Sequence, residues 1–270
     1  MEGIRETQSK VTYPKLRRFN GIMGALHFVQ ATFMLIASFV IPGVKDFKLD
    51  ISTDFRFFDP GPPPDLVPDF TIIENIIPLA ILAAVFLFIS AIAHFLTVLP
   101  GLNDFYNRKL GEGINYFRWF EYAISSSVMI FAISLLFGIQ NLAALIAIVA
   151  LNATMNLMGL MMEKHNQTTE KTDWTAFIIG TFSGIIPWIL IVIYLFGSGD
   201  VSEIPGFVWG IIGGYFFFFW TFPVNMILQY AKVGKWKDYL FGERGYIILS
   251  LVSKSLLAWT VFGGTFQPSG

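Results

Sequence analysis

Seven long apolar runs constrain the fold of this chain of 270 residues more than any other feature. Each run holds the ~20 residues that a helix needs to cross a bilayer. Charged residues make up 14% of the chain, whereas a soluble domain carries about 25%. We place the spans at residues 18–42, 71–99, 114–138, 141–163, 174–197, 206–230 and 243–264. The sequence therefore predicts an all-α membrane protein, one seven-transmembrane-helix bundle formed by residues 1–270.

The distribution of lysine and arginine predicts how the bundle sits in the cell membrane. Of the 18 basic residues, 14 fall in or beside the N-terminal tail and the second, fourth and sixth connections. Cytoplasmic loops carry the excess of positive charge, so we expect a cytoplasmic N-terminus and an extracellular C-terminus. The first apolar run is too long for a signal peptide and lacks a cleavage site, so we expect it to be retained.

The first extracellular connection, residues 43–70, is the only long one in this reading. Its segment KDFKLDISTDFRFFD alternates apolar and polar residues, which predicts a strand or a short β-hairpin that GPPPDLVP ends. A flexible acidic loop is the alternative. Long loops in compact domains often form interaction surfaces, so we expect a homodimer to use this one.

Lys254 lies in the middle of the last apolar run, in the segment SLVSKSLLAW. A lysine at the centre of a bilayer costs at least ~2.5–3.5 kcal/mol and is a functional-site hypothesis by default. A desolvated lysine loses basicity and condenses with aldehydes to form a Schiff base. The alternative is a structural lysine that pairs with a buried acid and joins two helices.

The third span supplies the best partner for this lysine. In NYFRWFEYAISSSVM, the residues Arg118, Glu121 and Ser125 share one helical face. Glu121 lies about 10 Å inside the cytoplasmic end, so we expect it to balance the charge of Lys254. The remaining candidate acids lie at span boundaries: Glu74, Glu163 and Glu243.

Two histidines lie inside spans, His27 in the first and His94 in the second. Both fall in the inner half of the bundle, with Gln30 one turn beyond His27 and Arg118 at the same end. This layer predicts a polar cavity that accepts a proton. A hydrogen-bonded pair of structural histidines is the alternative.

Aromatic residues precede a proline in the sixth span, YFFFFWTFPVNM. Phe219, Phe222 and Pro223 are positioned to form the wall of a site for a flat apolar ligand, with Tyr122 and Trp188 as further candidates. In a chain with 29 phenylalanines, ordinary packing is the alternative.

Together these residues resemble a microbial-type rhodopsin and, within that superfamily, a heliorhodopsin. The similarity rests on the seven spans, Lys254, the RWFEY segment, the histidines of the first two spans and the inverted orientation. It implies all-trans retinal bound to Lys254 as a protonated Schiff base, with Glu121 as counterion. The further matches to the retinal site are Ser125 and Ser250 beside the Schiff base, Phe219 and Phe222 as walls, and His27 and His94 in the proton-accepting cavity.

The resemblance implies a photoreceptor that is neither an enzyme nor an ion pump. Pumps carry a second carboxylate where this chain has Ser250, and a donor acid where it has VMIFAIS. A light-driven ion transporter, and a membrane protein that binds no retinal, remain as alternatives. We expect the lipid bilayer and an unidentified signalling protein as partners, and we expect neither a metal site nor a nucleic-acid partner.

Overall fold

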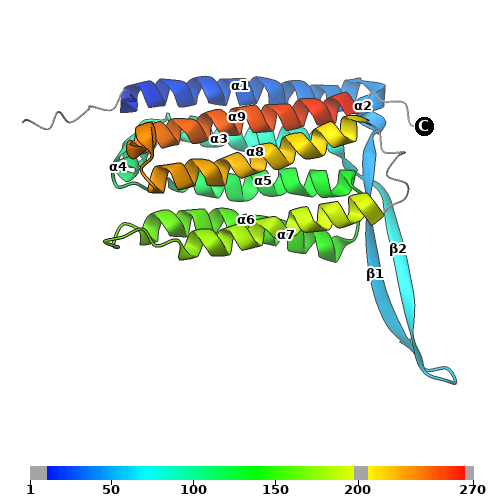
Figure 1. The fold of residues 1–270 in the computed structure, drawn as a ribbon. Coiled ribbons are helices and arrows are strands. Elements are labelled where there is room, and N and C mark those ends of the chain that lie inside the picture. The colour runs from blue at the N-terminus through cyan, green and yellow to red at the C-terminus, as the bar shows by residue number, and fades with distance from the viewer. Residues whose placement is uncertain (1–10, 198–205, 265–270) are drawn as a thin grey trace, which may run out of the picture.

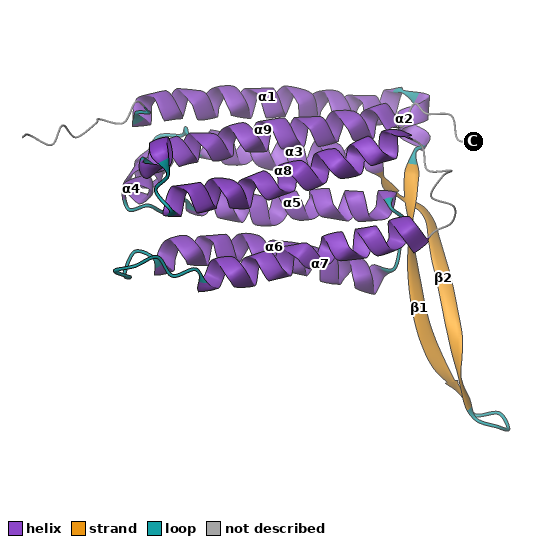
Figure 2. Cartoon of the chain, viewed as in Figure 1, coloured by secondary structure: helices purple, strands orange, loops and turns teal. Residues whose placement is uncertain are grey.

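A computed structural model describes residues 11–197 and 206–264 as a bundle of long helices with a projecting hairpin (Figures 1 and 2). Within the described residues, seven helices are long and apolar enough to span a membrane. They are α1 (Tyr13–Val40), α3 (Leu79–Leu96), α5 (Tyr116–Leu136), α6 (Leu142–His165), α7 (Thr175–Gly197), α8 (Gly206–Tyr230) and α9 (Tyr239–Gly264). The predicted fold class is confirmed.

Neighbouring helices form one continuous assembly. Helix α1 packs against α3 and α9, α3 against α5, α5 against α6, and α6 against α7, while α8 packs on α9. Helix α1 begins at the end of the bundle that holds α4 (Leu102–Gly111), and α9 ends at the opposite end, beside the hairpin (Figure 1). Helix α9, which contains Lys254, packs against α1, α3 and α8 and lies across the bundle from α6 and α7 (Figure 1).

The hairpin is longer than the sequence predicted. After the short helix α2 (Pro42–Asp46), strand β1 (Lys48–Asp59) pairs with the antiparallel strand β2 (Asp65–Pro78). Residues 71–78, which we predicted to begin the second span, continue the second strand instead. The run TIIENII is rich in β-branched residues, which favour strands, and hydropathy alone does not separate such a run from a helix.

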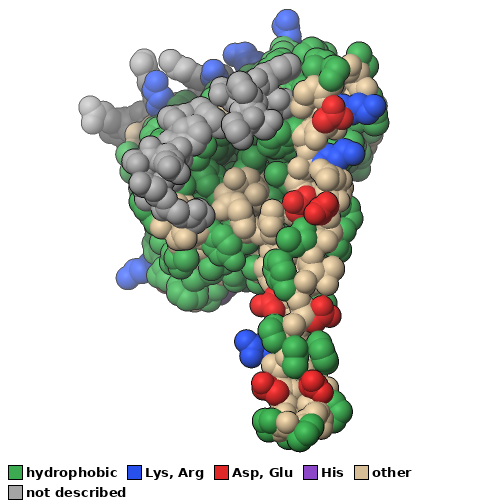
Figure 3. Space-filling view, turned by 90° about the vertical axis from the view of Figure 1, so that its right-hand side faces the viewer, with side chains coloured by type: hydrophobic (Ala, Val, Ile, Leu, Met, Phe, Trp, Pro, Cys, Tyr) green, Lys and Arg blue, Asp and Glu red, His purple; other side chains and the backbone are tan. Residues whose placement is uncertain are grey.

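The segment GPPP forms the turn of this hairpin rather than the end of the strand structure. The hairpin projects from the bundle, and acidic and hydrophobic side chains alternate along it (Figure 3). Its base is tied to the bundle where the backbone N–H of Ser52 donates to the carbonyl oxygen of Gln140, at 2.9 Å.

Two local features place the functional side chains. Asn115 caps α5, because its side-chain oxygen accepts a hydrogen bond from the backbone N–H of Arg118 at 3.0 Å. Gly180 brings α7 close to α6: a Cβ atom at this glycine would lie 2.9 Å from Cβ of Met158. Small residues at such crossings allow two helix backbones to approach closely.

Candidate functional site

A buried ion pair joins the last long helix to α5. Nζ of Lys254 lies 2.5 Å from Oε1 of Glu121, and the two side chains are only 3% and 7% exposed. Ser90 on α3 completes the site: its hydroxyl accepts from Nζ at 2.7 Å and donates to Oε1 at 2.7 Å. The structure thus brings together the two residues that the sequence predicted to pair, and it adds Ser90, a single hydroxyl in an apolar run that no spacing pattern marked.

Three other predicted residues surround this pair. The ring of Tyr122 lies under the ammonium group, with 5.0 Å between Nζ and the ring centroid. Its hydroxyl donates to the carbonyl oxygen of Tyr246 at 3.0 Å, which holds the ring in place. Ser125, one turn beyond Glu121, and Ser250, one turn before the lysine, are both buried.

A polar cavity begins at Glu121 and extends toward α4. It contains about 350 Å³ not filled by protein atoms, and His94, Asn20 and Ser250 form part of its lining. Nδ1 of His94 lies 2.7 Å from Oδ1 of Asn20. His27 stacks on His94 at a centroid distance of 5.6 Å, and neither of its ring nitrogens has a hydrogen-bond partner among the described residues.

Tyr106 of α4 closes the inner end of this cavity. Burial raises the pKa of its phenol well above the usual value, and the nearby charge of Glu243 acts in the same direction. The phenol therefore stays protonated at neutral pH and can donate a hydrogen bond to Glu243, whose Oε1 lies 3.5 Å away.

The placement of Gln30 corrects the sequence prediction. Its Oε1 accepts a hydrogen bond from Nε1 of Trp259 at 2.9 Å, and its Nε2 donates to the carbonyl oxygen of Leu26 at 3.2 Å. Trp259 is exposed on the outside of the bundle. Gln30 does not line the polar cavity, because its side chain bonds to Trp259 on the exposed side of the bundle.

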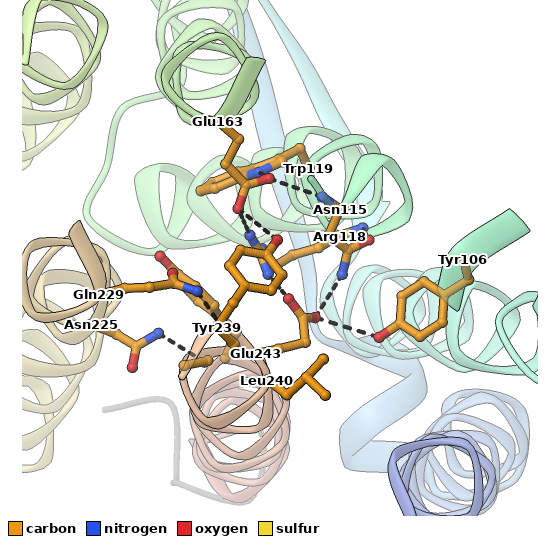
Figure 4. A network of polar contacts seen from close by, with 12 residues as sticks. Tyr106, Asn115, Arg118, Trp119, Glu163, Asn225, Gln229, Tyr239, Leu240 and Glu243 are labelled. Atoms are coloured by element: carbon orange, nitrogen blue, oxygen red, sulfur yellow. Dashed lines mark hydrogen bonds and ion pairs between the residues drawn. The ribbon is translucent and has the colours of Figure 1, made fainter. Parts of the chain in front are cut away.

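Arg118 lines the polar cavity, but its charge is held by two acids that the sequence placed at span boundaries (Figure 4). Its guanidinium forms ion pairs with Glu163 and Glu243, and both carboxylates are almost fully buried. Asn115 contributes to the same cluster, because its backbone N–H donates to Glu163 at 2.9 Å and its Nδ2 to Glu243 at 2.6 Å. Charged residues at helix ends usually face water, which is why the sequence did not reveal this cluster.

An apolar cavity lies on the other side of the lysine. The space not filled by protein atoms amounts to about 690 Å³, including the part that is open to the outside. The predicted wall residues Trp188, Phe219, Phe222 and Pro223 all line it, together with Tyr122 and Lys254. Trp188 and Phe219 meet edge to face at 5.4 Å. A slot between aromatic rings that ends at a buried amine fits a long, flat, apolar aldehyde.

Seven spanning helices, a lysine buried in the last of them and an acid on the third define a rhodopsin-type membrane protein. The model of the Heliorhodopsin family matches residues 16–266. The chain therefore belongs to the heliorhodopsin family, whose members are rhodopsin-type proteins with a retinal chromophore. Comparison with curated proteins gave no match.

Proposed function

We propose that this protein is a light-sensing photoreceptor that binds all-trans retinal through Lys254 as a protonated Schiff base, with Glu121 as counterion. The observation that carries the proposal is the buried pair itself, 2.5 Å from nitrogen to oxygen at one end of a large apolar cavity. A lysine and an acid that only joined two helices would need no such cavity beside them.

Retinal supplies the absorption of light and a change of shape when it is bound. The protein supplies the attachment, the charge balance and the exclusion of water. Lys254 holds the positive charge, while Glu121 and Ser90 fix its position by hydrogen bonds. The rings of Trp188 and Phe219 restrict the shapes that the cavity admits. If the bound ligand changes shape and moves Nζ of Lys254, the distance from Nζ to Oε1 of Glu121 changes as well.

His94 and His27 are the groups that we propose as proton acceptors, and Asn20 holds His94 in place through the 2.7 Å contact with its Nδ1. They lie on the α4 side of the ion pair, in or beside the polar cavity that begins at Glu121. Histidine takes up a proton near neutral pH more readily than any other unperturbed side chain.

The opposite side of the ion pair argues against ion transport. Toward the hairpin, the interior is filled by apolar side chains that include Leu87, Ile130, Ile133, Leu257 and Val261. Within the described residues, buried charged side chains occur at Lys254 and Glu121 and in the Arg118 cluster, and none lies in this outer half. A pump needs carboxylates that relay protons on both sides of the chromophore, so we favour the photoreceptor over a light-driven transporter.

We further propose that α1 begins in the cytoplasm and that the hairpin is extracellular, as the basic residues indicate. The hairpin exposes Phe55, Phe57, Phe58 and Phe70, and two-stranded hairpins are marginally stable without further contacts. A second copy of the chain that covers these rings would stabilise it, so we propose a homodimer. The signalling partner on the cytoplasmic side is a separate, unidentified protein.

The test is to add all-trans retinal to the purified protein and to record its absorption. We expect a visible band that Lys254→Ala abolishes and that Lys235→Ala, at an exposed loop lysine, leaves unchanged. A colourless wild-type protein would refute the retinal site. The same preparation in vesicles should show no light-driven pH change; a change that Lys254→Ala abolishes would replace the photoreceptor by a transporter.

A further inference from the structure

Part of the wall of the apolar cavity, on α5 and α6, is polar. The cavity crosses the bundle from α9 to α6, and α6 lies beyond α5, out of close contact with α9. At the α6 end it is lined by Ser126, Asn152 and Asn156. Both asparagines are more than nine-tenths buried, at 1% and 6% exposure. Apart from Ser253 and Lys254 on α9, the rest of the wall is aromatic and aliphatic, so three polar side chains together on α5 and α6 require an explanation.

The hydrogen bonds of this group use every donor that it has. Nδ2 of Asn152 donates to Ser126 at 2.7 Å and to Ser127 at 3.1 Å. Nδ2 of Asn156 donates to Ser126 at 3.0 Å and to the backbone oxygen of Asn152 at 2.8 Å. The hydroxyl of Ser126 donates to the backbone oxygen of Tyr122 at 2.6 Å. The polar atoms that remain are the two amide oxygens.

Within the described residues, the hydrogen bonds of Asn152 and Asn156 all run through their amide nitrogens, and neither amide oxygen is fully buried without a partner, so both oxygens can be reached from the cavity. The two asparagines are four residues apart on α6, so they lie one above the other on the same helical face. In ligand sites, a few polar groups placed in an apolar wall fix the orientation of the ligand.

We propose that Asn152 and Asn156 form a subsite for a hydroxyl group on the ring of the chromophore, so that the protein selects a ring-hydroxylated retinal. The inference rests on the proposed function, because attachment at Lys254 directs the ring toward α6. A hydroxyl group donates one hydrogen bond and accepts others. It therefore donates to one of the two amide oxygens, and it can accept from the amide N–H if that amide group is turned over.

The first test uses ring fragments that cannot react with the lysine. The protein without retinal is titrated with β-ionone and with 3-hydroxy-β-ionone, and binding is followed by the quenching of tryptophan fluorescence. One neutral hydrogen bond predicts that the hydroxylated fragment binds about 2- to 12-fold more tightly. The double variant Asn152→Leu with Asn156→Leu should remove this preference. Met155→Leu is the matched control, because Met155 lines the same end of the cavity and should keep the preference.

The second test asks whether the same preference applies to the whole chromophore. Equal amounts of all-trans retinal and its 3-hydroxy derivative compete for the protein, and the bound fraction is extracted and quantified. Enrichment of the hydroxylated form in the wild type and in Met155→Leu, and its loss in the asparagine variant, would support the subsite.

Equal binding of the two ionones and of the two retinals by the wild type would overturn the inference, even if the asparagine variant did not fold. A preference that persists in a folded asparagine variant would also overturn it. A wild-type protein that forms no pigment with either retinal would instead refute the proposed function, while the ionone titration would still decide the subsite.

Discussion

Separating the buried charges of Lys254 and Glu121 in the protein without retinal tests the structural basis of the site. Three variants suffice: Lys254→Met, Glu121→Leu and the two changes together. Each single change leaves one buried group without its charged partner, whereas the double change leaves an apolar contact between α5 and α9. In the two variants that lack Glu121, the single hydroxyl proton of Ser90 can donate instead to the backbone oxygen of Phe86, 3.1 Å away.

The structure sets the expected magnitudes. At the observed 2.5 Å, two unit charges in an effective dielectric constant of 20 attract each other by about 7 kcal/mol. Removal of the two ions from water costs several kcal/mol each. The two terms nearly cancel, so the double variant should differ from the wild type by no more than about 2 kcal/mol. Each single variant should lose about 3–5 kcal/mol, because the remaining charge stays buried without a partner.

The assay is reversible unfolding in mixed micelles, followed by circular dichroism. The double-mutant cycle isolates the interaction of the two residues. Ser90→Ala serves as a reference for the loss of a hydrogen bond that leaves the ion pair in place, and should cost about 1 kcal/mol. Additive effects, with a double variant as unstable as the sum of the two single variants, would show that the two charges do not stabilise each other.

Three further predictions concern colour, packing and pH. With retinal bound, Glu121→Gln should move the visible band to longer wavelength, because the counterion no longer stabilises the positive charge of the ground state. Gly180→Ala should destabilise the protein by about 1–3 kcal/mol through overpacking, whereas Gly210→Ala, with no neighbouring atom within 4 Å, should be neutral or stabilising in the same unfolding assay. Hydrogen bonds from the side chain and backbone of Thr175 lower the pKa of Asp173. The stability that these bonds contribute is present above the usual aspartate pKa and is lost when the pH falls through the lowered pKa. Hydrogen exchange at the N–H of Thr175, corrected for its intrinsic pH dependence, should then increase.

The spans and the central ion pair could be predicted from sequence because both follow from the energetics of burial. An apolar run long enough to cross a bilayer has few alternatives, and a lysine inside such a run requires a nearby acid. Glu121 was the one acid about two turns inside a span, so elimination identified it. The aromatic residues before Pro223 could be predicted as a wall, although the cavity itself depends on how α5 to α9 assemble.

The remaining contacts depend on tertiary structure that no local pattern encodes. Ser90 approaches Lys254 only because α3 packs against both α5 and α9. Glu163 and Glu243 are at the ends of helices far apart in sequence, and only the assembled bundle shows that they share Arg118. Residues 71–78 were assigned to a span because their hydropathy is high, although their pairing with β1 makes them a strand.

Helix α5 separates two sets of charges that its sequence places on one face. Arg118 and Glu121 are three residues apart, a spacing at which opposite charges pair on an isolated helix. In the bundle, Glu163 and Glu243 both bind Arg118, so Glu121 is left to Lys254. The arginine cluster therefore has an indirect effect on the site, because it leaves the carboxylate of Glu121 free to pair with Lys254. Because no other carboxylate in the described interior contacts Lys254, any movement of that positive charge is opposed mainly by Glu121. The hydroxyl of Ser90 touches both groups, so its contacts must change together with the ion pair when that charge moves.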